Sequence, residues 1–199
     1  MHCLVESRIL TGGDTLSLRL IRAVARTERA DELHLARLLI LLQEAGGKTN
    51  KPVDGIMKLA KLDFLLRYPN CLERALQAAG KNPSAANVQQ HERNTVETKM
   101  MRFRYGPWDG RYRRWIGLLL ARDLAVTYMS GRTVCVALTD KGRAVAAELS
   151  LLDDFSDLKL RSNLIVKAVG SKSGTGLKDF IYETFPEILD MKWGDEISL

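Results

Sequence analysis

The sequence predicts a mainly α protein of the α+β class, built from short apolar helices and one β-hairpin. Apolar residues recur at helical spacing along the 199-residue chain, most clearly within residues 33–42. Residues 124–129 and 133–138 are rich in strand-forming side chains and flank the turn Ser130-Gly131-Arg132, which is typical of a hairpin. A hydrophobic fraction of 46% and a charged fraction of 27% are ordinary for a globular protein and argue against wholesale disorder.

The first part of the chain predicts helices with one apolar side each. They cover residues 15–29, 32–44, 53–68 and 72–79. Asp31 precedes the second helix as a cap, and Gly46-Gly47 ends it. The polar stretch 81–94 lacks periodicity, so we expect a flexible loop there.

The second part predicts a strand over residues 95–105 that is closed by the turn Gly106-Pro107, then a helix over 110–122. The hairpin follows, and Thr139 caps a helix that runs to about residue 149. Helices, a strand, a helix, a hairpin and a helix in this order are typical of a winged helix-turn-helix, in which the hairpin is the wing.

The expected organisation has three parts. Residues 1–30 form an N-terminal helical arm, residues 31–152 the winged-helix domain, and residues 153–199 a C-terminal helical appendage. The appendage is expected to hold helices over 158–169 and 177–185, joined by a Gly/Ser loop. Its last helix carries four apolar residues on one face, which we expect to bind a partner chain: Leu177, Phe180, Ile181 and Phe185.

The charge is distributed unevenly along the chain. The whole protein has a formal net charge of +6, and residues 96–143 alone hold 10 basic and 4 acidic side chains, whereas residues 144–199 hold 6 basic and 10 acidic ones. Eight of the ten cations in 96–143 are arginines, which suit bidentate contacts to phosphate or carboxylate. The candidates for binding nucleic acid or an acidic partner are Lys99, Arg102, Arg104, Arg111, Arg113, Arg114, Arg132, Lys141 and Arg143.

The run Met101-Arg102-Phe103-Arg104-Tyr105 alternates cation and apolar side chain. In a strand this period places the arginines on one face and the apolar residues on the other. Three interpretations stay open for the arginines: contact with DNA phosphates, contact with an acidic protein surface, and plain solvation of an edge strand.

The sequence predicts no catalytic residue, metal or cofactor. The three cysteines and three histidines form no zinc or disulfide pattern, and no hydrolase motif is present. The Gly/Ser loop 170–176 lacks the Lys-Ser/Thr of a phosphate-binding P-loop, so a nucleotide-binding enzyme is a weak third option. Neither a signal peptide nor a membrane span is predicted, and we expect a cytoplasmic protein with no membrane partner.

Three segments, KLAKLDFLLRY, MRFRYGPWD and VALTDKGR, resemble in their order a group of bacterial winged-helix proteins. The shared features are a K-L-x-K-x-x-x-L-L helix, a Y-G-P turn and a closing L-T-x-K-G helix cap. The length and the tail SKSGTGLKDFIYETFPEI look like the small middle component of ABC-three-component systems, which are related to Lamassu-type anti-phage defence. The resemblance covers about residues 31–190.

The resemblance implies a non-catalytic adaptor that links the heads of an SMC-like ABC ATPase to a nuclease or other effector subunit. Double-stranded DNA, contacted through its backbone, is left open as a further partner. The alternative function is a dimeric winged-helix transcriptional regulator that reads operator DNA, which predicts salt-sensitive binding to one sequence.

Overall fold

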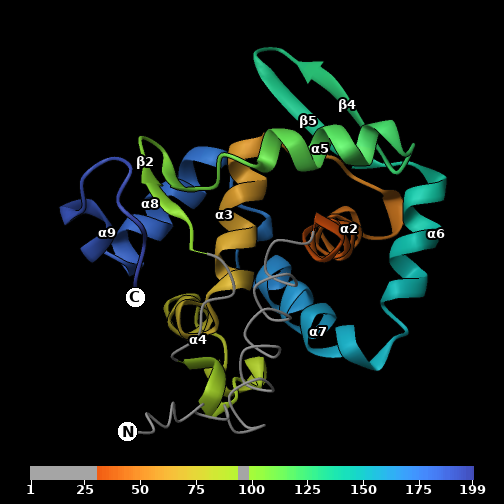
Figure 1. The fold of residues 1–199 in the computed structure, drawn as a ribbon. Helices are drawn as coiled ribbons and strands as arrows, with labels where there is room; N and C mark the ends of the chain where they lie inside the picture. The colour runs from red at the N-terminus through yellow and green to blue at the C-terminus, as the bar shows by residue number, and fades with distance from the viewer. Residues whose placement is uncertain (1–30, 94–98) are drawn as a thin grey trace, which may run out of the picture.

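The computed structural model describes residues 31–93 and 99–199, and its central element is the helix α2 (Asp31–Gly46) (Figure 1). Helices α3, α5, α6 and α7 surround α2, and every residue from His34 to Leu42 is buried. The sequence predicted one inward stripe for this helix. Because neighbours cover it on several sides, its whole middle is core instead. The arm expected over residues 1–30 lies outside the described residues.

The third expected helix begins later than predicted. Val53–Asp54 form the short strand β1, which pairs with a later strand, and α3 (Ile56–Arg67) starts only after Gly55. Two residues are too few for a period-2 pattern, so β1 left no signal in the sequence. Helix α4 (Pro69–Ala78) follows after a single residue, because a proline is well suited to the first turn of a helix.

The stretch expected as a flexible loop contains two short 3₁₀ turns, η2 (Pro83–Ala86) and η3 (Gln90–Arg93). The strand expected over 95–105 is in fact one arm of a small hairpin, β2 (Met101–Phe103) and β3 (Gly106–Trp108). The predicted turn Gly106-Pro107 therefore lies inside the second strand. Residues 94–98, which include the start of that prediction, lie outside the description.

Helix α5 (Tyr112–Ala121) leads into the predicted hairpin, strands β4 (Ala125–Ser130) and β5 (Thr133–Leu138). Strand β5 pairs with β4 on one side and with β1 on the other, which gives an antiparallel three-stranded sheet in the order β1-β5-β4. Helix α6 (Asp140–Leu149) follows directly, and the Thr139 hydroxyl accepts a hydrogen bond from Gly142 N at 2.9 Å as its cap.

The C-terminal part consists of α7 (Ser156–Ile165), which continues into the π-helical turn Val166–Gly170, α8 (Gly174–Thr184) and α9 (Glu187–Asp190). Helix α7 packs on α2, and α8 packs on α3 and α4. One hydrophobic cluster runs through these helices and through α2 to α6. The boundary expected at residue 152 thus does not separate two cores.

The last residues close the fold beside β2. Ile197 N donates to Met100 O at 2.8 Å, and the Tyr68 hydroxyl accepts from Met100 N at 2.7 Å and donates to Ile197 O at 3.1 Å. The described chain is 62% helical with eight α-helices and a small antiparallel sheet content, so the mainly α prediction is confirmed.

Candidate functional site

Helix α5 and the β4–β5 hairpin present the surface on which the sequence placed most of its candidate residues. The inward side of α5 buries Tyr112, Trp115, Ile116 and Leu119. Its outward side carries Arg113, Arg114, Gly117 and Leu120. The hairpin stands out from the helices above α5 (Figure 1). Hairpin and helix are thus available together to a partner.

A buried ionic cluster holds α5 against α2 and α3. The Asp63 carboxylate accepts a hydrogen bond from Arg37 Nε at 2.6 Å and another from the Tyr112 hydroxyl. Arg67 bonds Asp109 at 3.0 Å and lies 3.8 Å from Asp63. Charges this deep are tolerated only when they are paired. The cluster therefore serves to orient α5 and does not line its exposed face.

Asp109 links this cluster to the start of α5. Its carboxylate accepts hydrogen bonds from Arg111 N and Arg111 Nε, each at 3.0 Å, and the second oxygen bonds Arg111 at 2.7 Å. Burial raises the pKa of Asp109, but the hydrogen bonds from Arg111 and the charge of Arg67 outweigh it and lower the pKa to about 2. Arg111 also stacks over Trp115 at 4.9 Å, so most of its guanidinium is already engaged within the chain.

Arg102 does not lie on the surface where the alternating pattern placed it. The alternation along β2 exists but is inverted, because Arg102 is 8% exposed whereas Met101 and Phe103 are 37% and 44% exposed. Arg102 Nε donates to Ile188 O at 2.9 Å, and its guanidinium lies 5.4 Å from the Tyr182 ring. Arg102 therefore fastens β2 to the C-terminal helices. The prediction of a partner-facing side chain is wrong for this arginine within the isolated chain.

Three further candidates are exposed but already have partners. Arg114 binds Asp31 at 2.5 Å, Lys99 lies 3.5 Å from Glu196, and Lys141 donates to Arg122 O at 2.8 Å. The hydrogen bond from Arg114 lowers the pKa of Asp31. Exposed pairs of this kind contribute little to stability, so a phosphate or carboxylate of a partner could displace them at low cost.

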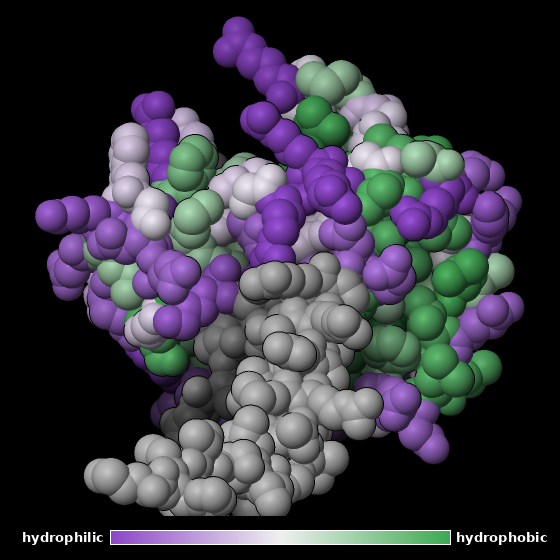
Figure 2. All heavy atoms as spheres, viewed as in Figure 1, coloured by the Kyte–Doolittle hydropathy of each residue, from purple (hydrophilic) through white to green (hydrophobic). Residues whose placement is uncertain are grey.

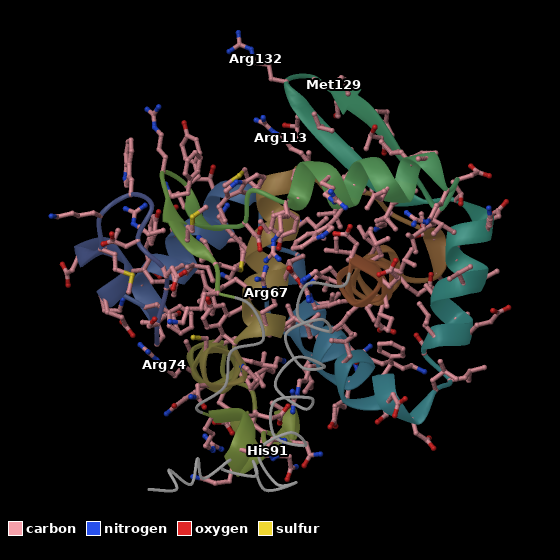
Figure 3. All side chains as sticks on the ribbon, viewed as in Figure 1. Arg67, Arg74, His91, Arg113, Met129 and Arg132 are labelled. Carbon is pink, nitrogen blue, oxygen red and sulfur yellow. The ribbon has the colours of Figure 1, made fainter. Side chains whose placement is uncertain are left out.

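The remaining candidates have no ion pair with any described residue. Arg113 on α5 and Arg132 at the hairpin tip are exposed and point to the same side of the molecule (Figure 3). Arg104 is exposed and lies 5.3 Å from the Tyr105 ring, and Arg143 on α6 is half-buried. The structure thus brings Arg113 and Arg132 onto one outward surface.

The four tail residues predicted to bind a partner lie inside this chain. Leu177, Ile181 and Phe185 are fully buried and Phe180 is 8% exposed. Phe185 packs edge-on against Phe64 of α3, with ring centroids 5.6 Å apart. The stripe is therefore core, and the prediction that it faces another chain is wrong. Apolar residues on a helix have the same spacing along the sequence whether the helix packs against its own chain or against another.

The hairpin exposes apolar side chains that were not predicted as functional from the sequence. Val126, Tyr128 and Met129 of β4 are 44%, 48% and 62% exposed, and Leu120 of the adjoining α5 is 38% exposed. Met129 is labelled on the hairpin in Figure 3. Val126 and Tyr128 lie on one face of the strand and Met129 on the other, so both faces of the hairpin expose apolar side chains. We call these four exposed residues together the apolar hairpin surface. The sequence does hold a signal for this surface, because the strand is apolar on both faces. In a hairpin that projects from the core, the same chain cannot bury both faces.

The described residues hold no group of three or more His, Cys, Asp or Glu side chains that could bind a metal ion. Within the same residues, no helix is both long and apolar enough to cross a membrane. No family model, no curated protein and no solved structure matches this chain.

Proposed function

We propose that this protein is a non-catalytic winged-helix adaptor subunit of a larger complex. The observation that carries the proposal is the sheet order β1-β5-β4, in which the first strand pairs with the second arm of the hairpin while α2, α3 and α5 pack below it. This arrangement of three helices and a three-stranded sheet is typical of winged helices, with α5 as the outward helix and β4–β5 as the wing. Residues 68–111 are then an insertion ahead of the outward helix.

The outward side chains favour a protein partner over the reading of DNA sequence. Base edges are read by Arg, Lys, Asn, Gln and similar polar groups, whereas beyond Arg113 and Arg114 the outer side of α5 presents Gly117 and Leu120. The apolar hairpin surface adds an aromatic residue and a methionine, types that are enriched in protein interfaces. A protein that recognises DNA base edges does not need an exposed aromatic residue or methionine at this position.

The resemblance to the middle component of ABC-three-component systems supplies the partners in this proposal. They are an SMC-like ABC ATPase and a nuclease or other effector, which would carry the chemistry of anti-phage defence. Arg113 on α5 and Arg132 at the hairpin tip add exposed positive charge to this part of the molecule. Such charges suit an acidic rim on the ATPase or the phosphate backbone of DNA held by it.

Co-expression with the neighbouring genes tests this function. The tagged protein should co-purify with an ATPase subunit, and the double variant Tyr128→Asp/Met129→Asp should lose that partner because charge is placed in an apolar contact. The matched control is Leu151→Asp, which alters an 80% exposed leucine beyond α6 and should keep the partner. If no ATPase or effector co-purifies with the unaltered protein, the proposal is wrong.

A dimeric transcriptional regulator is the second candidate, favoured by Arg113 on α5 and Arg132 at the hairpin tip, which are exposed and form no ion pair with the described residues. It predicts binding to one operator sequence that weakens steeply with salt and is lost in Arg113→Ala/Arg132→Ala. Equal affinity for unrelated duplexes in a gel-shift titration would contradict it.

A further inference from the structure

A pocket of about 720 Å³ lies between the hairpin, the start of α3 and the start of α8. Four segments that are distant in the sequence meet there: residues 54–61, Tyr105 between β2 and β3, the hairpin tip with residues 130–135, and residues 173–178. Figure 2 shows a notch at the upper edge of the molecule between the β4–β5 hairpin and the part that holds β2, β3 and α8, with hydrophilic side chains along the hairpin side. Its volume is in the range of small-molecule sites.

The lining of this pocket is strongly basic. Lys58, Lys61, Arg132 and Lys178 line it, and the single acidic side chain among the lining residues is Asp54. Lys178 lies 3.0 Å from Asp179, which is outside the lining. Hydroxyl groups of serine and threonine complete the polar part, from Ser130, Thr133, Ser173 and Thr175. Such a set offers hydrogen-bond donors and positive charge together.

Lys61 is the unusual member of the set because it is only 2% exposed. Its ammonium group donates to Met57 O at 3.1 Å, one turn back on α3, and forms no ion pair with a described residue. The stem of Lys61 is covered by Gly106, where an added Cβ would meet Lys61 Cε at 3.3 Å. Burial, together with the charge of Lys178, lowers the pKa of Lys61 to about 8. A buried cation without a carboxylate partner destabilises a fold unless an anion binds beside it.

Two helix N-termini also reach this pocket. Gly55 precedes α3 and provides no side-chain cap, whereas Ser173 caps α8 by accepting a hydrogen bond from Gly176 N at 3.0 Å. Amide groups at a helix start are donors without partners inside the helix and carry partial positive charge. They reinforce the attraction of the four basic side chains for an anion.

We propose that this pocket binds the phosphate groups of a ligand of about nucleotide size. Phosphate oxygens match the donors on residues 54–61, 130–135 and 173–178, and the space exceeds what a lone phosphate needs. A free nucleotide and the phosphates of a DNA strand share this chemistry. Val126, Tyr128 and Met129 do not line the pocket, so phosphate binding there does not rest on the adaptor function.

Calorimetric titration with pyrophosphate, ATP and a short DNA duplex at constant ionic strength tests the site, with adenosine as the uncharged comparison. We expect binding of pyrophosphate and ATP but not of adenosine. The variant Lys58→Gln/Lys178→Gln should bind at least about tenfold more weakly, because two ligand-facing charges are lost. The control Lys159→Gln/Lys167→Gln removes the same charge from exposed positions around α7 and should bind normally.

Lys61→Met distinguishes a binding role from a structural one. This variant should melt at a higher temperature than the unaltered protein without ligand, yet bind pyrophosphate more weakly. If only the duplex binds, and the pocket variant weakens it, the phosphate source is DNA and the site stands. If no probe binds, or if the pocket variant binds as tightly as its control, the proposal is overturned, whatever partners co-purify.

Discussion

Asp63 lies at the meeting point of three helices with none of its surface exposed. Burial raises the pKa of this carboxyl, but the charges of Arg37 and Arg67 and the hydrogen bonds from Arg37 and Tyr112 outweigh burial, so the pKa is lowered. Asp63 therefore stays ionised at neutral pH. Its partners come from α2, α3 and α5, so one carboxylate fixes the position of the outward helix from within.

Asp109 gives this cluster a measurable pH dependence. Its folded pKa of about 2 lies below the unfolded value of 3.8, so its contribution is complete above about pH 4 and is lost as the pH falls towards 2. Between about pH 4 and pH 2, the free energy of unfolding of the unaltered protein should therefore fall by about 2 kcal/mol more than that of Asp109→Asn. Urea unfolding at a series of pH values measures this, and parallel pH profiles for the two proteins would contradict it.

At the scale of elements, the hairpin is fixed to α5 through the start of α6. Thr139 N donates to Leu124 O at 3.2 Å, and the Thr139 hydroxyl donates to Asp123 O at 2.7 Å. The backbones approach so closely here that a Cβ on Gly142 would lie 1.8 Å from Leu124 O. Glycine is therefore required at this position. The contact sets the angle at which the hairpin leaves α5.

Two glycine substitutions separate this contact from general helix propensity. Gly142→Ala should lower the free energy of unfolding by at least about 2 kcal/mol, because backbone atoms on both sides must move. Gly117→Ala, in the outward side of α5 with open space around its Cβ, should raise it by about 0.5–1 kcal/mol. Denaturant titrations of both variants check the pair. Similar changes in the free energy of unfolding for the two variants would contradict the close approach of Gly142 to Leu124 O.

At the scale of the whole molecule, the C-terminal part is a layer of the core and not an appendage. Phe185 is fully buried against Phe64, and Arg74 lies 4.7 Å from the Phe185 ring while it pairs with Glu187. Contacts of this kind join residues far apart in the chain. The molecule should therefore unfold as one unit.

The variant Phe185→Ala tests whether the molecule unfolds as one cooperative unit. It should destabilise the protein by about 3–5 kcal/mol, since an aromatic side chain is removed from a filled core. The fluorescence of Trp115 on α5 should report the same shifted midpoint as circular dichroism, in a background with Trp108→Phe and Trp193→Phe. A Trp115 transition that does not shift would mean that the tail unfolds separately. Leu189→Ala, at a 50% exposed position, is the control.

The sequence predicted the helices and the hairpin well because their periodicity is local. It could not say what each apolar stripe packs against, so the tail stripe around Phe185 was assigned to another chain. For the same reason, the predicted orientation of the β2 side chains was the opposite of the observed one. The burial of Arg102 depends on Ile188 and Tyr182, which lie far along the chain. Arg113 and Arg132 were predictable as exposed, since neither interrupts an apolar stripe. The pocket around Lys61 was not predictable, because four segments that are distant in the sequence build it.

The pairing of the final residues with β2 bears on how the protein is made. Tyr68 and Met100 emerge from the ribosome long before Ile197, which takes its place beside them. Until then, the groups that Ile197 and Phe185 cover remain open to water. Helices of the first half can form during translation, but the core cannot close before residues 185–197 have emerged. Closure of the core thus waits for this late segment and does not proceed step by step along the chain.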